Sequence, residues 1–300
     1  MVRKSMVAGL VAVQRRPGLV ALTYGVNLAL AFILAVPVYV VLADVVGPTG
    51  FGDDLVHRFD IVLWADILEK AGPLLGALWS QLLWMIPLYV VWKVLLSVGL
   101  FHALRDGAAR PFWTGVGRYG GRGLLVSAIY GVLGLVWAGF SALVTAGIVL
   151  GWGGEVGAFW GGFVVGPALA ALGLAVLDLM HDYALIAVVT DERRVWAALL
   201  AGIRWPLRHA AAPALYALWL LPAALLLLLP TLVEFNLGGV WGVFLLQQLF
   251  LVARAAVTVA WYGSEVALYE AVRQQETPLL AGTDAPVPFA SGEVASGRSG

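Results

Sequence analysis

Residues 157–189 read GAFWGGFVVGPALAALGLAVLDLMHDYALIAVV, a run that stays apolar until close to its end. About 20 apolar residues in a helix cross the hydrocarbon core of a bilayer, so this run is long enough to span a membrane. Asp178, His181 and Asp182 interrupt the apolar pattern, and ionisable groups at such depth normally face the interior of a helix bundle. The stretch therefore predicts a membrane helix with one polar face.

The whole chain shares this character. Of its 300 residues, 61% are hydrophobic and only 12% are charged, whereas about a quarter are charged in soluble proteins. The formal net charge is zero, which gives no reason to expect a nucleic-acid partner. The absence of cysteine excludes disulfides, thiolate catalysis and cysteine-ligated metals. The composition thus predicts an integral membrane protein whose surroundings are the lipid bilayer.

Five further runs are long enough to cross a membrane. We expect an all-α, polytopic bundle of six transmembrane helices within one membrane domain, residues 1–273. The predicted spans are 17–46, 73–104, 123–150, 157–189, 210–233 and 239–270. The segment 274–300 is rich in Gly, Pro, Ala and Ser, which predicts a disordered cytoplasmic tail.

The loops predict the orientation. Before the first span, and in the loops after the second and fourth, the basic residues are Arg3, Lys4, Arg15, Arg16, Arg105, Arg110, Arg118, Arg122, Arg193, Arg194, Arg204 and Arg208. The odd-numbered loops hold only Arg58 and Lys70. Basic residues collect on the cytoplasmic side, so both termini are expected there. The abundance of Gly, Ala, Val, Leu and Arg is typical of GC-rich bacterial genomes, which points to the bacterial cytoplasmic (inner) membrane.

Two of the basic loops share a pattern. RYGGR at 118–122 precedes Tyr130, and RWPLR at 204–208 precedes Tyr216, with a constant offset of 86 residues. The pattern, with a weaker match in Arg15-Arg16-Pro17, suggests a three-fold helix-hairpin repeat with units 1–105, 106–190 and 191–273. Each unit would begin with an interfacial elbow helix, such as residues 5–15. The alternative interpretation is that arginine and aromatic residues collect at any inner interface.

Polar residues inside the spans form the candidate site. The predicted intramembrane polar core comprises Asn27, Lys93, Asp178, Asp182, Arg254 and Glu265. Counting from the cytosolic helix ends places Asn27, Lys93 and Asp178 at about the same depth. We expect Lys93 to lie near Asp178, with Arg254 or Asn27 beside them. His181 is expected to point to a different face, at the level of the lipid headgroups.

The polar core has two interpretations, because polar contacts between helices stabilise membrane bundles as well as forming sites. The four histidines, His57, His102, His181 and His209, lack metal-ligand spacing. The sequence also shows no Gly-rich phosphate loop and no evident Ser–His–Asp arrangement. We therefore predict no cofactor, no metal site and no catalytic residue.

Several short segments carry a resemblance to a known group of proteins. They are FHALRDG at 101–107, DYALIAVV at 182–189, DERR at 191–194, AAL at 197–199 and RWPLR at 204–208. They resemble a large set of uncharacterised bacterial six-span membrane proteins, similar to the membrane domain fused to some glycerophosphodiester phosphodiesterases. The resemblance covers most of residues 1–273 and implies a six-helix bundle with interfacial helices. It carries over no catalytic residue, because the hydrolase chemistry of those fusions belongs to a separate soluble domain.

Three functions remain open on the sequence. The first is a non-enzymatic membrane protein that binds or moves a lipid or small solute through the polar core, or a membrane subunit of a transport or envelope complex. Its partners would be that ligand and a membrane protein or a second copy of the chain. The second is a structural scaffold without a ligand. The third is a membrane enzyme that acts on lipid headgroups through Asp178 and Asp182.

Overall fold

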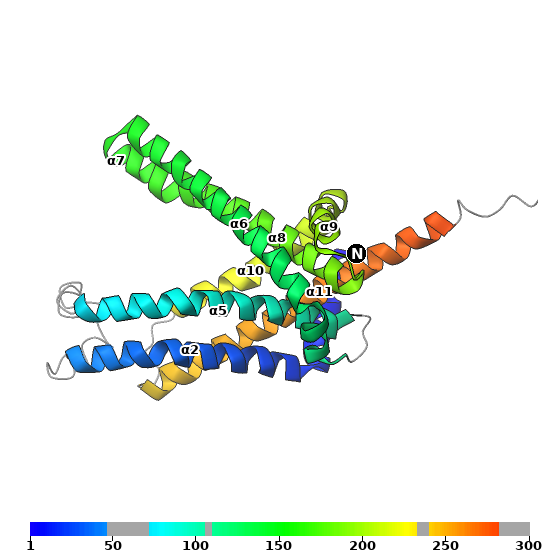
Figure 1. The fold of residues 1–300 in the computed structure, drawn as a ribbon, viewed down its shortest axis with the longest axis horizontal. Helices are drawn as coiled ribbons and strands as arrows, with labels where there is room; N and C mark the ends of the chain where they lie inside the picture. Colours follow the sequence, from blue (N-terminus) through cyan, green and yellow to red (C-terminus); the bar gives the residue numbers. More distant parts are fainter. Residues whose placement is uncertain (47–71, 106–109, 233–239, 282–300) are drawn as a thin grey trace, which may run out of the picture.

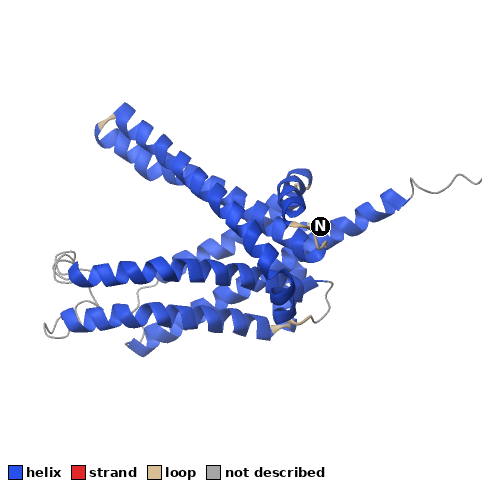
Figure 2. Ribbon diagram, in the orientation of Figure 1, coloured by secondary structure: helices blue, strands red, loops and turns tan. Residues whose placement is uncertain are grey.

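The computed structural model describes residues 1–46, 72–105, 110–232 and 240–281, and these residues are almost entirely helical (Figure 2). The elements are α1 (Val2–Arg15), α2 (Pro17–Val46), α5 (Gly72–Leu104), α6 (Phe112–Trp152), α7 (Gly154–Gly157), the π-helix η3 (Ala158–Val165), α8 (Gly166–Thr190), α9 (Val195–Arg208), α10 (Ala211–Leu232) and α11 (Val240–Ala281). No strand occurs in the part of the chain that the structure describes.

Six helical segments are long and apolar enough to cross a membrane. They lie on α2, α5, α6, the continuous α7–η3–α8 segment, α10 and α11. Each predicted apolar span lies on one of these segments. The predicted fold class, an all-α polytopic membrane bundle, is therefore confirmed.

Helix breaks explain which interfacial helices form. Arg16 has φ −135° and ψ 58°, and Pro17 opens α2, so α1 is a separate helix. Proline fits the first position of a helix because it lacks the N–H that a preceding turn would use. His209, with φ −120° and ψ 92°, separates α9 from α10, whereas Pro206 lies inside α9.

The second expected elbow helix does not form. Residues 118–122 lie inside α6, which runs unbroken from Phe112 to Trp152. This segment contains no proline, so every backbone N–H can join the helical hydrogen-bond ladder. The repeat interpretation is corrected accordingly: only the first and third units begin with a separate helix.

The helices converge at one end, which we call the arginine-rich end because Arg105, Arg118, Arg122, Arg193 and Arg208 lie there. From it, the hairpin of α6 and α8 diverges from α2 and α5 (Figure 1). Fully buried side chains near this end include those of Phe101, Leu185, Ile186 and Leu268. The hairpin instead exposes large apolar side chains along its length, such as Leu143 at 74% and Phe163 at 78%. A membrane helix presents such a surface to lipid.

Close backbone contact docks α1 against α11. A Cβ atom at Gly9 would meet Ser264 and the carbonyl of Ala260, so only glycine allows this approach. The C-terminal end of α11 corrects another expectation. Residues 274–281 are helical and do not belong to a disordered tail, whereas residues 282–300 of the predicted tail lie outside the described residues.

Candidate functional site

Three polar residues gather near the middle of α8. Asp178, His181 and Asp182 each offer one ligand-type atom, and these atoms lie within 4.8 Å of one another. Asp182 is only 4% exposed, and its Oδ1 lies 3.6 Å from Nδ1 of His181. These residues are one helical turn apart or adjacent, so the regular geometry of α8 brings them together. Among the described residues, these three side chains form the group that could hold a metal ion.

Two neighbouring helices supply partners to this cluster. The Tyr216 hydroxyl on α10 donates a hydrogen bond of 2.9 Å to Oδ2 of Asp178. On the other side, Nε2 of His181 lies 2.7 Å from Oγ of Ser127 on α6. The rings of Tyr130 and His181 pack edge to face, with their centroids 5.5 Å apart. The cluster therefore links α8 to both α6 and α10.

These contacts correct two expectations. Asp178 was expected to meet a cation, but in the described part of the chain its partner is the neutral hydroxyl of Tyr216. His181 does face a different helix from Asp178, as expected. However, it is hydrogen-bonded to Ser127 inside the bundle and is not a free polar group at the headgroup level.

A second acidic position lies on α11. Glu265 is 0% exposed; its Oε1 accepts a hydrogen bond of 2.8 Å from Nε1 of Trp261, while Oε2 has no hydrogen-bond partner among the described residues. One turn earlier, the Tyr262 hydroxyl lies 3.0 Å from Oγ of Ser97 on α5. Ser97 also donates to the carbonyl of Lys93, so Tyr262 is the donor to Ser97.

The six residues of the predicted polar core fall into two groups. Asp178, Asp182 and Glu265 lie close enough to interact electrostatically with one another, and Lys93 acts on Asp182 at longer range. The side chain of Lys93 is nevertheless exposed and forms no ion pair with a described residue.

Asn27 and Arg254 lie outside this group. Arg254 is exposed and Asn27 is half-buried, and neither forms a hydrogen bond or ion pair with the three acids. The polar contact between α2 and α11 is made instead by the Tyr24 hydroxyl, which donates to Oε1 of Gln248 at 2.7 Å.

The hydrogen bonds made by Tyr216, Ser127 and Tyr262 were not predicted from the sequence. Tyr216 and Tyr130 were noticed only through their common offset from arginines. A hydroxyl or indole group inside an apolar span predicts a hydrogen bond to another polar group, because such a group must find a partner when it is buried in lipid or protein.

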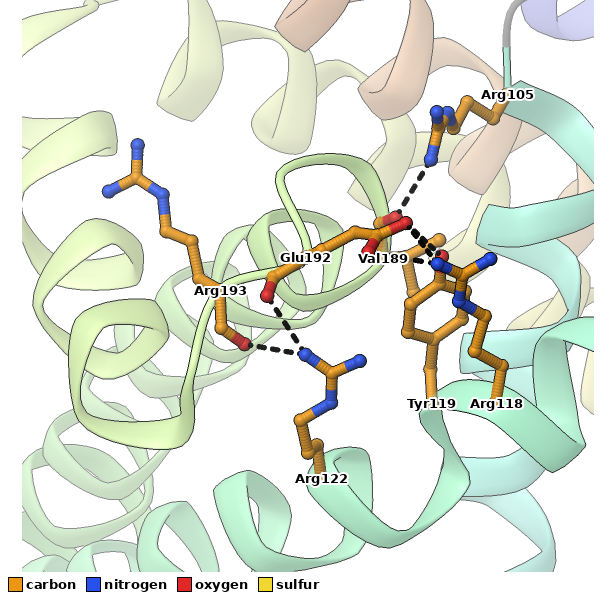
Figure 3. A network of polar contacts seen from close by, with 7 residues as sticks. All are labelled: Arg105, Arg118, Tyr119, Arg122, Val189, Glu192 and Arg193. Carbon is orange, nitrogen blue, oxygen red and sulfur yellow. Dashed lines mark hydrogen bonds and ion pairs between the residues drawn. The ribbon is translucent and has the colours of Figure 1, made fainter.

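A separate polar network fixes the turn between α8 and α9 (Figure 3). Glu192 adopts a positive φ of 54°, and its carboxylate accepts hydrogen bonds from Arg118 at 2.8 Å and from Tyr119 at 3.1 Å. Nη1 of Arg122 donates to the carbonyls of Glu192 and Arg193 at 2.9 and 3.2 Å. The hydrogen bond from Tyr119, together with the nearby Arg118 guanidinium, holds the pKa of Glu192 below its ordinary value.

Comparison of the chain with family models, with curated proteins and with solved structures finds no match. The resemblance to the membrane domain of the phosphodiesterase fusions therefore stays an expectation.

Proposed function

We propose that this protein is a non-enzymatic, multi-pass protein of the bacterial inner membrane that binds a cation in its polar core. The binding group comprises Asp178, Asp182 and Glu265. The cation is a proton, or the ammonium group of a lipid or small solute that the protein binds or moves. The observation that carries the proposal is the fully buried carboxylate of Glu265, whose Oε2 lacks a hydrogen-bond partner among the described residues.

The charge balance of the core supports a cationic ligand. In the described part of the chain, none of the three acids forms an ion pair with lysine or arginine, and Asp182 meets only the imidazole of His181. A buried carboxylate is strongly destabilised in its charged form unless a cation pairs with it. The two buried acids, Asp182 and Glu265, therefore need protons or a bound cation, and ionisable groups inside membrane proteins commonly mark such pathways.

The orientation follows from the distribution of basic residues. We infer that the arginine-rich end faces the cytoplasm, because lysine and arginine collect on that side of membrane proteins. The acids then lie on the cytoplasmic side of the bundle, since Asp182 is followed by only eight residues of α8 (Asp182 to Thr190) before the arginine-rich turn. A ligand would reach the core from the cytoplasm or from the cytoplasmic leaflet.

A structural scaffold is the alternative. The contacts of Tyr216 with Asp178 and of Ser127 with His181 favour it, because each joins α8 to a neighbouring helix. Such contacts stabilise membrane bundles by about 0.6–2 kcal/mol each without any ligand. In that case the chain would serve as a membrane subunit of a larger assembly.

The experiment uses two readouts on detergent-purified protein. Native mass spectrometry detects a bound cationic molecule, and infrared difference spectroscopy detects a protonated carboxyl group. We expect Glu265→Gln and Asp182→Asn to remove the bound mass or the carboxyl band of the wild-type protein. Glu155→Gln is the matched control, because Glu155 is exposed on α7.

The scaffold interpretation predicts a different result. The wild-type protein would carry no extra mass, and its carboxyl band, which buried neutral acids also give, would not change with the pH of the solution. That outcome would refute the proposal.

A further inference from the structure

A groove between α6 and α9 lies apart from the polar core. Its volume is about 500 Å³, and its walls are formed by Leu125, Ala128, Ile129, Val132, Val195 and Trp196. The volume falls within the roughly 300–1,000 Å³ of pockets that hold small molecules. The lining contains no charged side chain, so the groove accepts an apolar chain rather than a polar solute.

Two arginines are close in sequence to residues that line one end of this groove. Arg122 precedes Leu125 by one turn of α6, and Arg194 immediately precedes Val195. Arg122 uses Nη1 for the carbonyls of Glu192 and Arg193, which leaves Nη2 and Nε able to donate. The Arg194 side chain is exposed, and the structure shows no hydrogen bond or ion pair for that side chain within the described residues.

The acids near the groove are already neutralised. Glu192 pairs with Arg118 at 2.8 Å, and Asp191 pairs with Arg193 and Arg273 at 2.9 Å each. Arg122 and Arg194 therefore leave a net positive charge at this end.

The faces of α9 place the groove at a membrane surface. Ala198, Gly202 and Pro206 are buried against the bundle. A second stripe exposes apolar side chains at helical spacing, comprising Trp196 at 74%, Leu200 at 50%, Ile203 at 38% and Leu207 at 74%. Arg204 and Arg208 are exposed on the remaining face. A helix with this pattern lies in the interface, with its apolar stripe in lipid and its arginines at the headgroups.

We propose that this groove binds an anionic glycerophospholipid from the leaflet at the arginine-rich end. One acyl chain lies along Leu125, Ile129 and Val132, and the phosphate contacts Arg122 and Arg194. Charge complementarity selects the lipid, because guanidinium groups bind phosphate oxygens by charge-assisted hydrogen bonds. This lipid is distinct from any ligand of the acidic core, which attracts cations.

The test is a lipid titration followed by native mass spectrometry of the delipidated protein. Phosphatidylglycerol and phosphatidylcholine are added at equal concentration, and the fraction of protein with one bound lipid is measured. We expect the wild-type protein to prefer phosphatidylglycerol. Arg194→Gln should weaken phosphatidylglycerol binding about fivefold, which is the contribution of one arginine near an anionic lipid surface, and should leave phosphatidylcholine binding unchanged.

Matched controls separate the groove from general lipid contact. Arg208→Gln removes an arginine from the far end of α9 and should have no effect. Ala128→Trp should fill the groove and lower the binding of both lipids, whereas Ala138→Trp, on an exposed position of the same helix outside the groove, should not. Arg122→Lys retains the positive charge but removes the guanidinium group that is hydrogen-bonded to the α8–α9 turn. This variant therefore tests whether a loss of lipid binding results from a disturbed turn alone.

Equal binding of the two lipids by the wild-type protein would overturn the proposal. So would equal losses in Arg194→Gln and Arg208→Gln. A thermal melt of each variant identifies any that fail to fold, and Arg194→Gln carries the test in that case because the Arg194 side chain forms no hydrogen bond or ion pair with a described residue.

Discussion

The hydrogen bond between Tyr216 and Asp178 offers a direct measure of what joins α8 to α10. At 2.9 Å it ends on a carboxylate oxygen, and hydrogen bonds to charged groups contribute about 1.5–3 kcal/mol. Polar contacts between membrane helices contribute less, about 0.6–2 kcal/mol. Tyr216 is 7% exposed, whereas Asp178 is half-buried. We therefore expect a coupling free energy of about 1–2 kcal/mol.

A double-mutant cycle measures this coupling. Tyr216→Phe, Asp178→Ala and the double variant are unfolded with SDS in mixed micelles, and helix content is followed by circular dichroism. Asp178→Asn keeps an acceptor but removes the charge, so it should lose less stability than Asp178→Ala. The control cycle pairs Tyr216→Phe with Thr145→Ala, because Thr145 bonds only to the carbonyl of Ser141 on its own helix.

The control pair should be additive within about 0.3–0.5 kcal/mol. A coupling free energy between Tyr216 and Asp178 that is no larger than that of the control pair would contradict the reasoning. It would mean that the bond contributes nothing to holding α8 against α10.

Three further predictions follow from other contacts. Gly173→Ala should lower the free energy of unfolding by about 1–3 kcal/mol, measured by the same SDS titration, because the added Cβ would overlap the indole of Trp137. The pKa of Glu192 is lower in the folded protein than its ordinary value of 4.5, so its contacts stabilise the fold fully above pH 4.5 and are lost as the pH falls through the folded value. The melting temperatures of the wild type and Glu192→Gln should therefore converge in acid. In membranes, a polar maleimide should label Arg204→Cys but not Leu207→Cys, because only the first position faces water; equal labelling would contradict the orientation of α9.

The sequence predicted the transmembrane segments well because a long apolar run has one stable arrangement in lipid. Helix ends were less predictable. The helix is interrupted at Arg15-Arg16-Pro17, where proline begins a new helix. Residues 118–122 carry similar basic residues but no proline, and they remain helical. Charge patterns place a segment at an interface, but they do not decide whether the helix bends there.

Side-chain partners in the polar core were the least predictable feature. Counting residues from the helix ends gives depth along the axis but gives neither tilt nor the direction in which a side chain points. Asp178 and Lys93 were predicted to lie at one depth and both act electrostatically on Asp182, yet Asp178 is hydrogen-bonded to Tyr216 and not to Lys93. Asn27 shared the predicted level of Asp178, yet it forms no hydrogen bond with the three acids, and neither does Arg254, which is exposed.

The length of the hairpin formed by α6 and α8 has a consequence for the surrounding lipid. α6 has 41 residues, and the part from Arg122 to Trp152 alone extends about 45 Å at 1.5 Å per residue. The hydrocarbon core of a bilayer measures only about 30 Å. Because Arg122 is tied to the α8–α9 turn, the free end of the hairpin must tilt to bury its apolar side chains. A thinner bilayer would lay the hairpin flatter and a thicker one would raise it, so its divergence from α2 and α5 (Figure 1) would vary with membrane thickness.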